Sequence, residues 1–202
     1  MEKTIAKSLL SIKAVFLRPE EPFTWASGIK SPIYCDNRLI LSDPAVRDTV
    51  EKAIAATVKE KFPGAKALMG TSTAGIAHAA IAASILGMPM GYVRSEAKTH
   101  GRQSKIEGRL ESGTPVVVIE DLISTGGSVI DVVNSLREAG AEVLGIVSIF
   151  TYGLAKGIRR LSDAGVINYS LSNLDVLVDV ALAEGYITAT QKEEIIKFRD
   201  SL

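Results

Sequence analysis

Short runs of hydrophobic residues alternate along this chain with longer stretches in which hydrophobic residues recur every three or four positions. Residues 116–119 are four consecutive β-branched residues, which is typical of a strand buried on both faces of a parallel sheet. The segment after residue 128 places its hydrophobic residues on one helical face, and Gly140 is suited to the end of that helix. This face consists of Val129, Val132, Val133, Leu136 and Ala139.

The same alternation extends over most of the chain. The other expected strands are residues 67–70, 90–93, 143–150 and 166–171. The other expected helices are residues 2–17, 74–86, 158–164 and 173–184, one that begins at Ser42-Asp43-Pro44 and ends near Phe62, and one from Thr188 or Thr190 to Arg199. Residues 23–38 have no clear period and are expected to be irregular.

Strands that alternate with helices predict an α/β fold, a Rossmann-like parallel sheet flanked by helices, with ligands at the carboxyl ends of the strands. We expect residues 1–202 to form a single domain, because no linker, internal repeat or low-complexity stretch divides them. The core should be about residues 43–172. Residues 1–42 and 173–202 lie outside the alternation and are expected to form a small cap over the edge of the sheet.

Composition narrows the choice of partners. The chain is 47% hydrophobic and 23% charged, and Lys plus Arg equals Asp plus Glu at 23 each. No overall charge therefore draws it to nucleic acid or to a membrane. The hydrophobic run 76–86 is too short to span a bilayer, and the first residues lack the hydrophobic core of a signal peptide. Cys35 is the single cysteine, which excludes an intrachain disulfide and favours the cytoplasm.

The segment that follows strand 116–119 carries the clearest candidate chemistry. Two acids come first, and a run of hydroxyl and glycine residues then opens a helix, where backbone N–H groups can bind a phosphate. Carboxylates repel a phosphate but accept hydrogen bonds from hydroxyls, so the segment as a whole suits a ribose 5-phosphate. The alternative is an ordinary turn rich in small residues. The residues are Glu120, Asp121, Leu122, Ile123, Ser124, Thr125, Gly126, Gly127 and Ser128.

This segment resembles the 5-phosphoribosyl-1-diphosphate (PRPP) motif of the type I phosphoribosyltransferases. The resemblance implies a type I phosphoribosyltransferase core in which Glu120 and Asp121 hold the ribose hydroxyls of PRPP and residues 124–128 hold its 5′-phosphate. No GxxxxGK[ST] occurs in the chain, and no GxGxxG follows a strand, so other phosphate motifs are excluded.

A basic segment, residues 94–109, holds five basic residues against two acidic ones and few hydrophobic anchors. By itself it is typical of a mobile surface loop or of a lid. It is similar to the Tyr-x-Arg-x-Glu-x-Lys-x-His-Gly pattern of the lid in orotate phosphoribosyltransferases. The matching residues are Tyr92, Arg94, Glu96, Lys98, His100 and Gly101.

The lid resemblance implies that mobile cations neutralise the charge of the leaving diphosphate. Arg94 and Lys98 would contact the diphosphate, and His100 would either do the same or protonate the leaving oxygen. Ser95 stands where the family commonly has a second basic residue.

Two further segments support the same family. Residues 23–32 are similar to its Phe-Thr-x-x-Ser-Gly-x-x-Ser-Pro segment beside the base, with Ala26 where many members have lysine. Trp25, Ile33 and Tyr34 could supply faces for a pyrimidine, although Phe23 and Trp25 equally suit the core of the cap. Candidate hydrogen-bonding groups for the base are Ser27, Gly28, Lys30 and Ser124.

Residues 70–75 follow a strand, open a helix and resemble the pyrophosphate loop of the family. Any binding there must rest on backbone and hydroxyl groups, because Ala74 replaces the frequent lysine. The candidate residues are Thr71, Ser72, Thr73 and Ala74. His78 lies one turn further among alanines, and we expect it to be a packed residue instead of a ligand.

Together these resemblances imply an enzyme that transfers phosphoribose from PRPP to orotate, with Arg94, Lys98, His100 and Asp121 as its catalytic residues. They imply Mg²⁺ carried by the substrate without a direct protein ligand, and a homodimer whose lids are shared between subunits. A phosphoribosyltransferase for purine bases and a non-catalytic transcriptional regulator that senses PRPP are the alternatives. Balanced charge and the absence of a recognisable DNA-binding element argue against the regulator.

Overall fold

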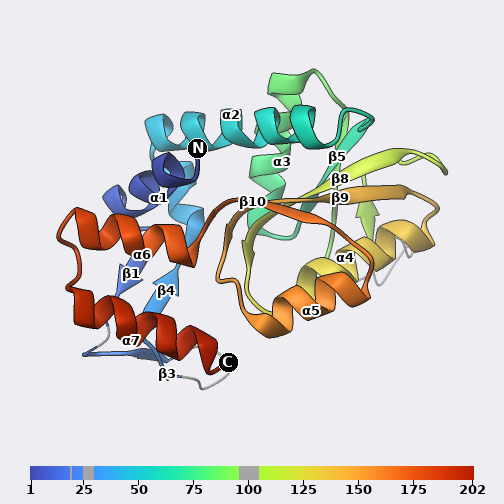
Figure 1. The fold of residues 1–202 in the computed structure, drawn as a ribbon. Helices are drawn as coiled ribbons and strands as arrows, with labels where there is room; N and C mark the ends of the chain where they lie inside the picture. Colours follow the sequence, from blue (N-terminus) through green and yellow to red (C-terminus); the bar gives the residue numbers. More distant parts are fainter. Residues whose placement is uncertain (19, 25–29, 96–104) are drawn as a thin grey trace.

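A mostly parallel sheet lies at the centre of the computed structural model, which describes residues 1–18, 20–24, 30–95 and 105–202 (Figure 1). Within these residues the sheet has six strands in the order β10-β9-β8-β5-β6-β7. Neighbouring strands are parallel, apart from β6 and β7, which are antiparallel. The predicted α/β fold is confirmed, but the sequence pattern does not predict β7. The strands are β5 (Ala67–Thr71), β6 (Met90–Val93), β7 (Ile106–Glu107), β8 (Pro115–Ile123), β9 (Glu142–Thr151) and β10 (Asn168–Asn173).

Helices cover both faces of this sheet (Figure 1). One face carries α2 (Pro44–Lys61) and α3 (Ala74–Leu86), and the other carries α4 (Gly127–Glu138) and α5 (Ala155–Asp163). Strand β8 supplies side chains to both layers, because successive strand residues point to opposite faces. Val117 and Ile119 join one buried hydrophobic cluster, and Val116 and Val118 join the other. An uninterrupted hydrophobic run is what a strand covered on both sides requires.

Two helices begin at their predicted capping residues. The Asp43 carboxylate accepts hydrogen bonds from the backbone N–H groups of Ala45 and Val46, at 3.1 and 3.0 Å, and Pro44 is the first residue of α2. Thr188 forms a reciprocal capping box with Gln191 at the start of α7. Such caps satisfy backbone donors that have no partner inside the helix.

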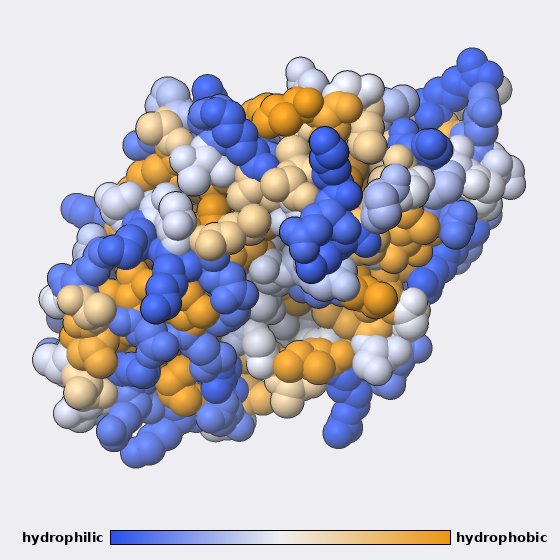
Figure 2. Space-filling model, turned by 45° about the horizontal axis from the view of Figure 1, so that its top comes forward, coloured by the Kyte–Doolittle hydropathy of each residue, from blue (hydrophilic) through white to orange (hydrophobic). Residues whose placement is uncertain are grey.

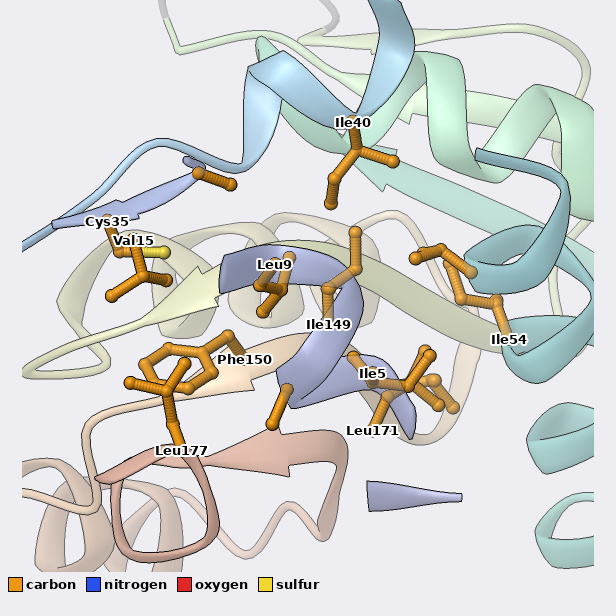
Figure 3. Close-up of a cluster of buried hydrophobic side chains, with 14 of the residues drawn as sticks. Ile5, Leu9, Val15, Cys35, Ile40, Ile54, Ile149, Phe150, Leu171 and Leu177 are labelled. Carbon is orange, nitrogen blue, oxygen red and sulfur yellow. The ribbon is translucent and has the colours of Figure 1, made fainter. Parts of the chain in front are cut away.

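The first and last segments of the chain gather at one side of the sheet (Figure 1). Strands β1 and β4 pair with each other there, as do β2 and β3. Figure 3 shows Ile5 and Leu9 of α1 close to Ile149 and Phe150 of β9 in one buried cluster. The elements are α1 (Glu2–Ser11), β1 (Val15–Leu17), β2 (Phe23–Thr24), β3 (Lys30–Ser31), β4 (Ile33–Cys35), the 3₁₀ helix η1 (Asn37–Ser42), α6 (Leu174–Ala183) and α7 (Ala189–Asp200).

The prediction of one helix over residues 2–17 is wrong. Helix α1 ends at Ser11, and Lys13 has a φ of 56°, a left-handed conformation that stops a helix. The chain then turns into β1, whose Phe16 lies opposite Tyr34 of β4. Ile12 and Phe16 continue the hydrophobic spacing of the helix. Residues 15–17 nevertheless form a strand, because they pair with β4.

Other strands also begin or end at residues that the sequence does not predict. Their bounds are set by pairing with a neighbouring strand, which the local hydrophobic pattern does not reveal. Residues 23–38 contain β2, β3 and β4 instead of being wholly irregular. Strand β8 continues through Glu120 and Asp121 to Ile123, since β9 pairs with it over that length. Strand β10 begins at Asn168 and ends at Asn173, two residues later than predicted at both ends.

The surface of the molecule is mainly polar in the view of Figure 2, where hydrophobic side chains form separate groups among hydrophilic ones. Among the described residues, no helix combines the length and the hydrophobicity that a membrane span requires.

Candidate active site

The order of the strands reverses at the centre of the sheet. The chain passes from β5 to β6 on one side and later returns to place β8 on the other side of β5. In open α/β sheets the carboxyl ends of the strands leave a crevice at such a switch point. A cleft of about 370 Å³ lies here, between the ends of β5, β6 and β8 and helix α4. It is lined by Thr71, Ser72, Val93, Arg94, Ser95, Lys105, Glu120, Asp121, Leu122, Ser128, Asp131, Val132 and Ser135.

The predicted acid pair lies in this cleft. Glu120 is only 5% exposed, and its Oε1 accepts hydrogen bonds from the Thr71 hydroxyl and from the Asp121 backbone N–H, both at 2.9 Å. Burial, with the adjacent Asp121 carboxyl, raises the pKa of Glu120 to about 8, although the bonds from Thr71 and the Asp121 N–H oppose the shift. Glu120 is therefore mainly protonated at neutral pH, and the pair carries one negative charge less than its sequence suggests.

The predicted phosphate loop forms the start of α4. Gly126 precedes the helix with a φ of +75°. The first N–H groups of α4 have no partners within the helix, as at the start of any helix. Helix α5 supports the loop from behind, because a Cβ added to Gly157 would lie 2.5 Å from the Ser124 carbonyl oxygen. Ser128 reaches the main cleft, whereas Ser124 lines a neighbouring cavity of about 330 Å³ with Thr151 and Gly153.

The predicted pyrophosphate loop brings two of its residues to the cleft. Ser72 directly follows β5, and its hydroxyl donates a hydrogen bond to the Val93 carbonyl at 2.6 Å. The Thr71 hydroxyl is directed to Glu120. Thr73 precedes α3 and Ala74 begins it, but neither is among the described residues that line the cleft. The peptide bond between Ser72 and Thr73 is cis.

Two parts of the basic segment, at Arg94 and at Lys105, meet beside the cleft. The Arg94 N–H donates a hydrogen bond to the Lys105 carbonyl at 2.8 Å, and both residues, with Ser95, line the cleft. Arg94 Nη1 also lies 3.6 Å from Glu107 Oε1. The remaining lid residues that the sequence indicates lie outside the described residues; they are Glu96, Lys98, His100 and Gly101.

The segment predicted to lie beside the base is partly described. Tyr34 is 37% exposed, while Phe23 packs between Phe16 and Tyr34, with ring centroids at 6.2 and 5.6 Å. Ile33 is 1% exposed, so the prediction that it offers a face to the base is wrong. Lys30 is exposed on β3. Trp25, Ala26, Ser27 and Gly28 lie outside the described residues.

The sequence analysis missed several lining residues. Asp131 and Ser135 line the cleft from the same face of α4 as the predicted Ser128, and the spacing of three and four residues between them is that of a single helical face. The signal was therefore present in the polar residues, although only the hydrophobic face of this helix was considered. Lys105 belongs to the basic segment 94–109, but its place in the cleft was not predicted because it depends on the pairing of β7 with β6.

His78 has the packed position that its sequence environment indicates. Its side chain is fully buried, and Nδ1 lies 2.5 Å from Glu51 Oε1 of α2. Burial raises the pKa of Glu51, and its contact with His78 opposes that shift. The pair joins α2 to α3 and does not line the cleft.

An acid pair and a phosphate loop at the switch point of a parallel sheet define a type I phosphoribosyltransferase domain. A family model described as phosphoribosyl transferase domain matches residues 38–183, and the chain belongs to this family. An orotate phosphoribosyltransferase of Listeria innocua is 56% identical over 197 residues, which are 96% of this chain and 94% of the relative. The corresponding protein of Listeria monocytogenes serotype 4b is 54% identical over 199 residues, 98% of this chain and 95% of the relative.

A solved structure agrees with these relatives. The crystal structure of orotate phosphoribosyltransferase from Aeropyrum pernix superposes with a TM-score of 0.78 at 30% identity, covering 91% of this chain and 99% of that one. Within the phosphoribosyltransferases the chain therefore belongs to the orotate phosphoribosyltransferases, enzymes of pyrimidine biosynthesis.

Proposed function

We propose that this chain transfers the 5-phosphoribosyl group of PRPP to orotate and releases orotidine 5′-monophosphate and pyrophosphate. The observation that carries the proposal is the cleft at the switch point, where the acid pair, the start of α4 and three residues of the basic segment, Arg94, Ser95 and Lys105, converge. In the reaction, the bond between the anomeric carbon and the diphosphate oxygen breaks, and an orotate nitrogen forms the new bond to that carbon. No protein nucleophile is needed, because the ribose becomes a cation that orotate captures.

Each cleft element has a role in this proposal. Asp121 and Glu120 accept hydrogen bonds from the ribose hydroxyls, and residues 124–128 hold the 5′-phosphate through backbone N–H groups and hydroxyls. Thr71, Ser72, Thr73 and Ala74 form the pyrophosphate loop. Arg94, Lys98 and His100 neutralise the charge that grows on the leaving diphosphate.

Orotate is anionic and planar, so it needs both polar contacts at its edge and a flat neighbour. We assign Ser27, Gly28, Lys30 and Ser124 to the edge. The exposed Tyr34 ring, which rests on Phe23, is suited to a face. Ser124 lines the neighbouring cavity with Thr151 and Gly153.

Mg²⁺ fits this cleft as a cation that the substrate carries. Among the described residues, no three or more His, Cys, Asp and Glu side chains are grouped to hold a metal. The cleft nevertheless offers the carboxylates of Asp121 and Asp131, and protein-bound Mg²⁺ commonly keeps several waters and binds substrate phosphates with few carboxylates. We propose no direct protein ligand. When bound, Mg²⁺ would neutralise part of the diphosphate charge.

The proposal extends to the organisation of the molecule. Residues 1–202 act as one domain, with a core of about residues 43–172 and a cap of residues 1–42 and 173–202. The enzyme works in the cytoplasm as a homodimer, without nucleic acid or membrane partners, and each lid serves the neighbouring subunit. The contacts of the cap with β9 and β10 in one hydrophobic cluster support its assignment to the same domain.

A spectrophotometric assay of orotate tests the proposed function. The purified protein should consume orotate only when PRPP and Mg²⁺ are both present. Turnover of adenine or xanthine without loss of orotate would assign the chain to a purine enzyme. Specific retardation of DNA in a gel, without turnover of any base, would indicate the regulator instead.

A further inference from the structure

The main-chain carbonyl of Asp121 has a hydrogen-bond partner far away in the sequence. Its oxygen accepts a bond from Asn37 Nδ2 at 2.7 Å, across 84 residues. Asn37 is the first residue of η1 and is 1% exposed. Its Oδ1 accepts a bond from the Cys35 thiol at 3.2 Å, and burial raises the pKa of Cys35, so the sulfur keeps its proton. Both polar ends of the Asn37 side chain are therefore occupied.

The arrangement of the sheet explains why Asp121 needs this donor. The last residue pair between β5 and β8 is Gly70 with Ile119, whereas β8 continues to Ile123 beside β9. The two strands therefore separate at the floor of the cleft. Beyond Ile119, backbone groups of β8 that point toward β5 have no strand partner there.

The carbonyl of Asp121 is such a group. The carbonyl of Pro115 faces β5, because it accepts a hydrogen bond from the Lys66 N–H, and the carbonyl of Ile119 faces the Thr71 hydroxyl. Every second residue of a strand points its carbonyl to the same side, so Asp121 points beyond the end of β5. The amide of Asn37 takes the place of the missing strand.

The segment that carries Asn37 is itself firmly held by the cap. The Asp36 N–H donates a hydrogen bond to the Ala14 carbonyl at 2.7 Å, and Cys35 pairs with Val15. Figure 3 shows Cys35 beside Val15 and near Phe150 in the buried cluster. A displacement of Asn37 would therefore have to move β1 and β4 as well.

We propose that Asn37 is a positioning residue for Asp121, and that through it the cap fixes the acid at the floor of the cleft. The carbonyl and the carboxylate of Asp121 belong to one residue, so a fixed main chain limits where the carboxylate can lie. This inference rests on the proposed function, in which Asp121 holds the ribose hydroxyls of PRPP.

A double-mutant cycle tests the inference. Asn37→Ala leaves the buried carbonyl without its donor, and kcat/KM for PRPP should fall about tenfold. In an Asp121→Asn background the same substitution should cost less than about twofold, since contacts that act through one another are not additive. KM for orotate should stay within about twofold in both backgrounds. Equal losses of kcat/KM in the two backgrounds would overturn the inference.

Two more variants separate positioning from general stability. Asn37→Leu keeps about the size of the side chain but removes the donor, so it should lose at least as much kcat/KM as Asn37→Ala. Asn173→Ala removes an amide whose Oδ1 accepts a hydrogen bond from the Val176 N–H at 3.0 Å at the start of α6, and it should leave KM for PRPP unchanged. An Asn37→Leu enzyme with wild-type kinetics would exclude the positioning role.

Calorimetric titration with PRPP and Mg²⁺ distinguishes this inference from the proposed function. If the wild type binds PRPP but does not consume orotate, the proposed function fails. The cycle measured on PRPP affinity then still decides whether Asn37 acts through Asp121.

Discussion

Asp121 is the residue on which the proposed ribose contact depends most directly. Asp121→Asn keeps the size of the side chain but weakens charge-assisted hydrogen bonds, each worth about 1.5–3 kcal/mol. We expect kcat/KM for PRPP to fall by roughly one to two decades, while the melting temperature changes little. The exposed Asp163 at the end of α5 offers a control, since Asp163→Asn should be fully active. A fully active Asp121→Asn enzyme would show that the ribose lies elsewhere.

Glu120 gives the free protein a specific dependence on pH. Its pKa is raised from 4.5 to about 8, so the folded state keeps a proton that the unfolded chain has lost. The free energy of unfolding should therefore fall as the pH rises from about 5 to about 8, by at most ~1.4 kcal/mol per pH unit. The Gln side chain of Glu120→Gln does not titrate, so the variant lacks this contribution to the pH dependence. Urea denaturation across the interval should show the wild type losing stability relative to the variant, and equal pH slopes would contradict the assignment.

At the scale of single residues, the sequence predicted contacts within one segment and missed contacts between segments. Glu120, Asp121 and Ser128 reach the same cleft, and their closeness in the chain made this predictable. The bonds from Thr71 to Glu120 and from Asn37 to Asp121 span 49 and 84 residues. Neither the hydroxyl nor the amide carries a local sign of its partner.

At the scale of elements, the packing of α3 on β8 holds Thr71 against Glu120. Gly75 makes this close approach possible, since a Cβ added to it would lie 2.5 Å from the Ile119 carbonyl oxygen and against the Thr71 hydroxyl. Gly75→Ala should therefore destabilise the protein by about 1–3 kcal/mol. The melting temperature should fall by roughly 2–4 °C for each kcal/mol, and activity should fall with it because Thr71 loses its place.

Gly64→Ala is a matched control for this substitution. A Cβ at Gly64 meets nothing within 4 Å, so the melting temperature and the activity should remain those of the wild type. Scanning calorimetry and the orotate assay measure both variants. Equal melting temperatures for Gly75→Ala and the wild type would show that α3 can move away from β8 at no cost.

The sequence predicts helices that begin with a clear capping residue. It does not predict short strands that form only by pairing with another strand. Asp43 and Thr188 mark the starts of α2 and α7 because capping is a local interaction. The short β7 forms only because β6 lies beside it. The sequence places the end of α1 too late, because residues 15–17 become strand β1 only through pairing with β4, which lies further along the chain.

At the scale of the whole molecule, the fold could be predicted because alternating strands and helices leave few possible topologies. The same topology brings the ends of β5, β6 and β8 to one cleft. The proposed lid and the proposed shared dimer do not follow from this topology, because neither is determined by the order of the strands in one chain. The quaternary arrangement therefore needs a test of its own.

Mixing two inactive variants tests whether the lid acts on the neighbouring subunit. If Lys98 acts in trans while Asp121 acts in cis, Lys98→Ala and Asp121→Asn should each be nearly inactive as homodimers. In a mixed dimer, one site then collects both substitutions and the other site has neither. Random reassortment of equal amounts makes half of the dimers mixed, so activity should recover to about a quarter of wild type by two-fold counting. If each lid closes over its own subunit, every site keeps one substitution, and the rate stays low after subunit exchange has been confirmed by native mass spectrometry.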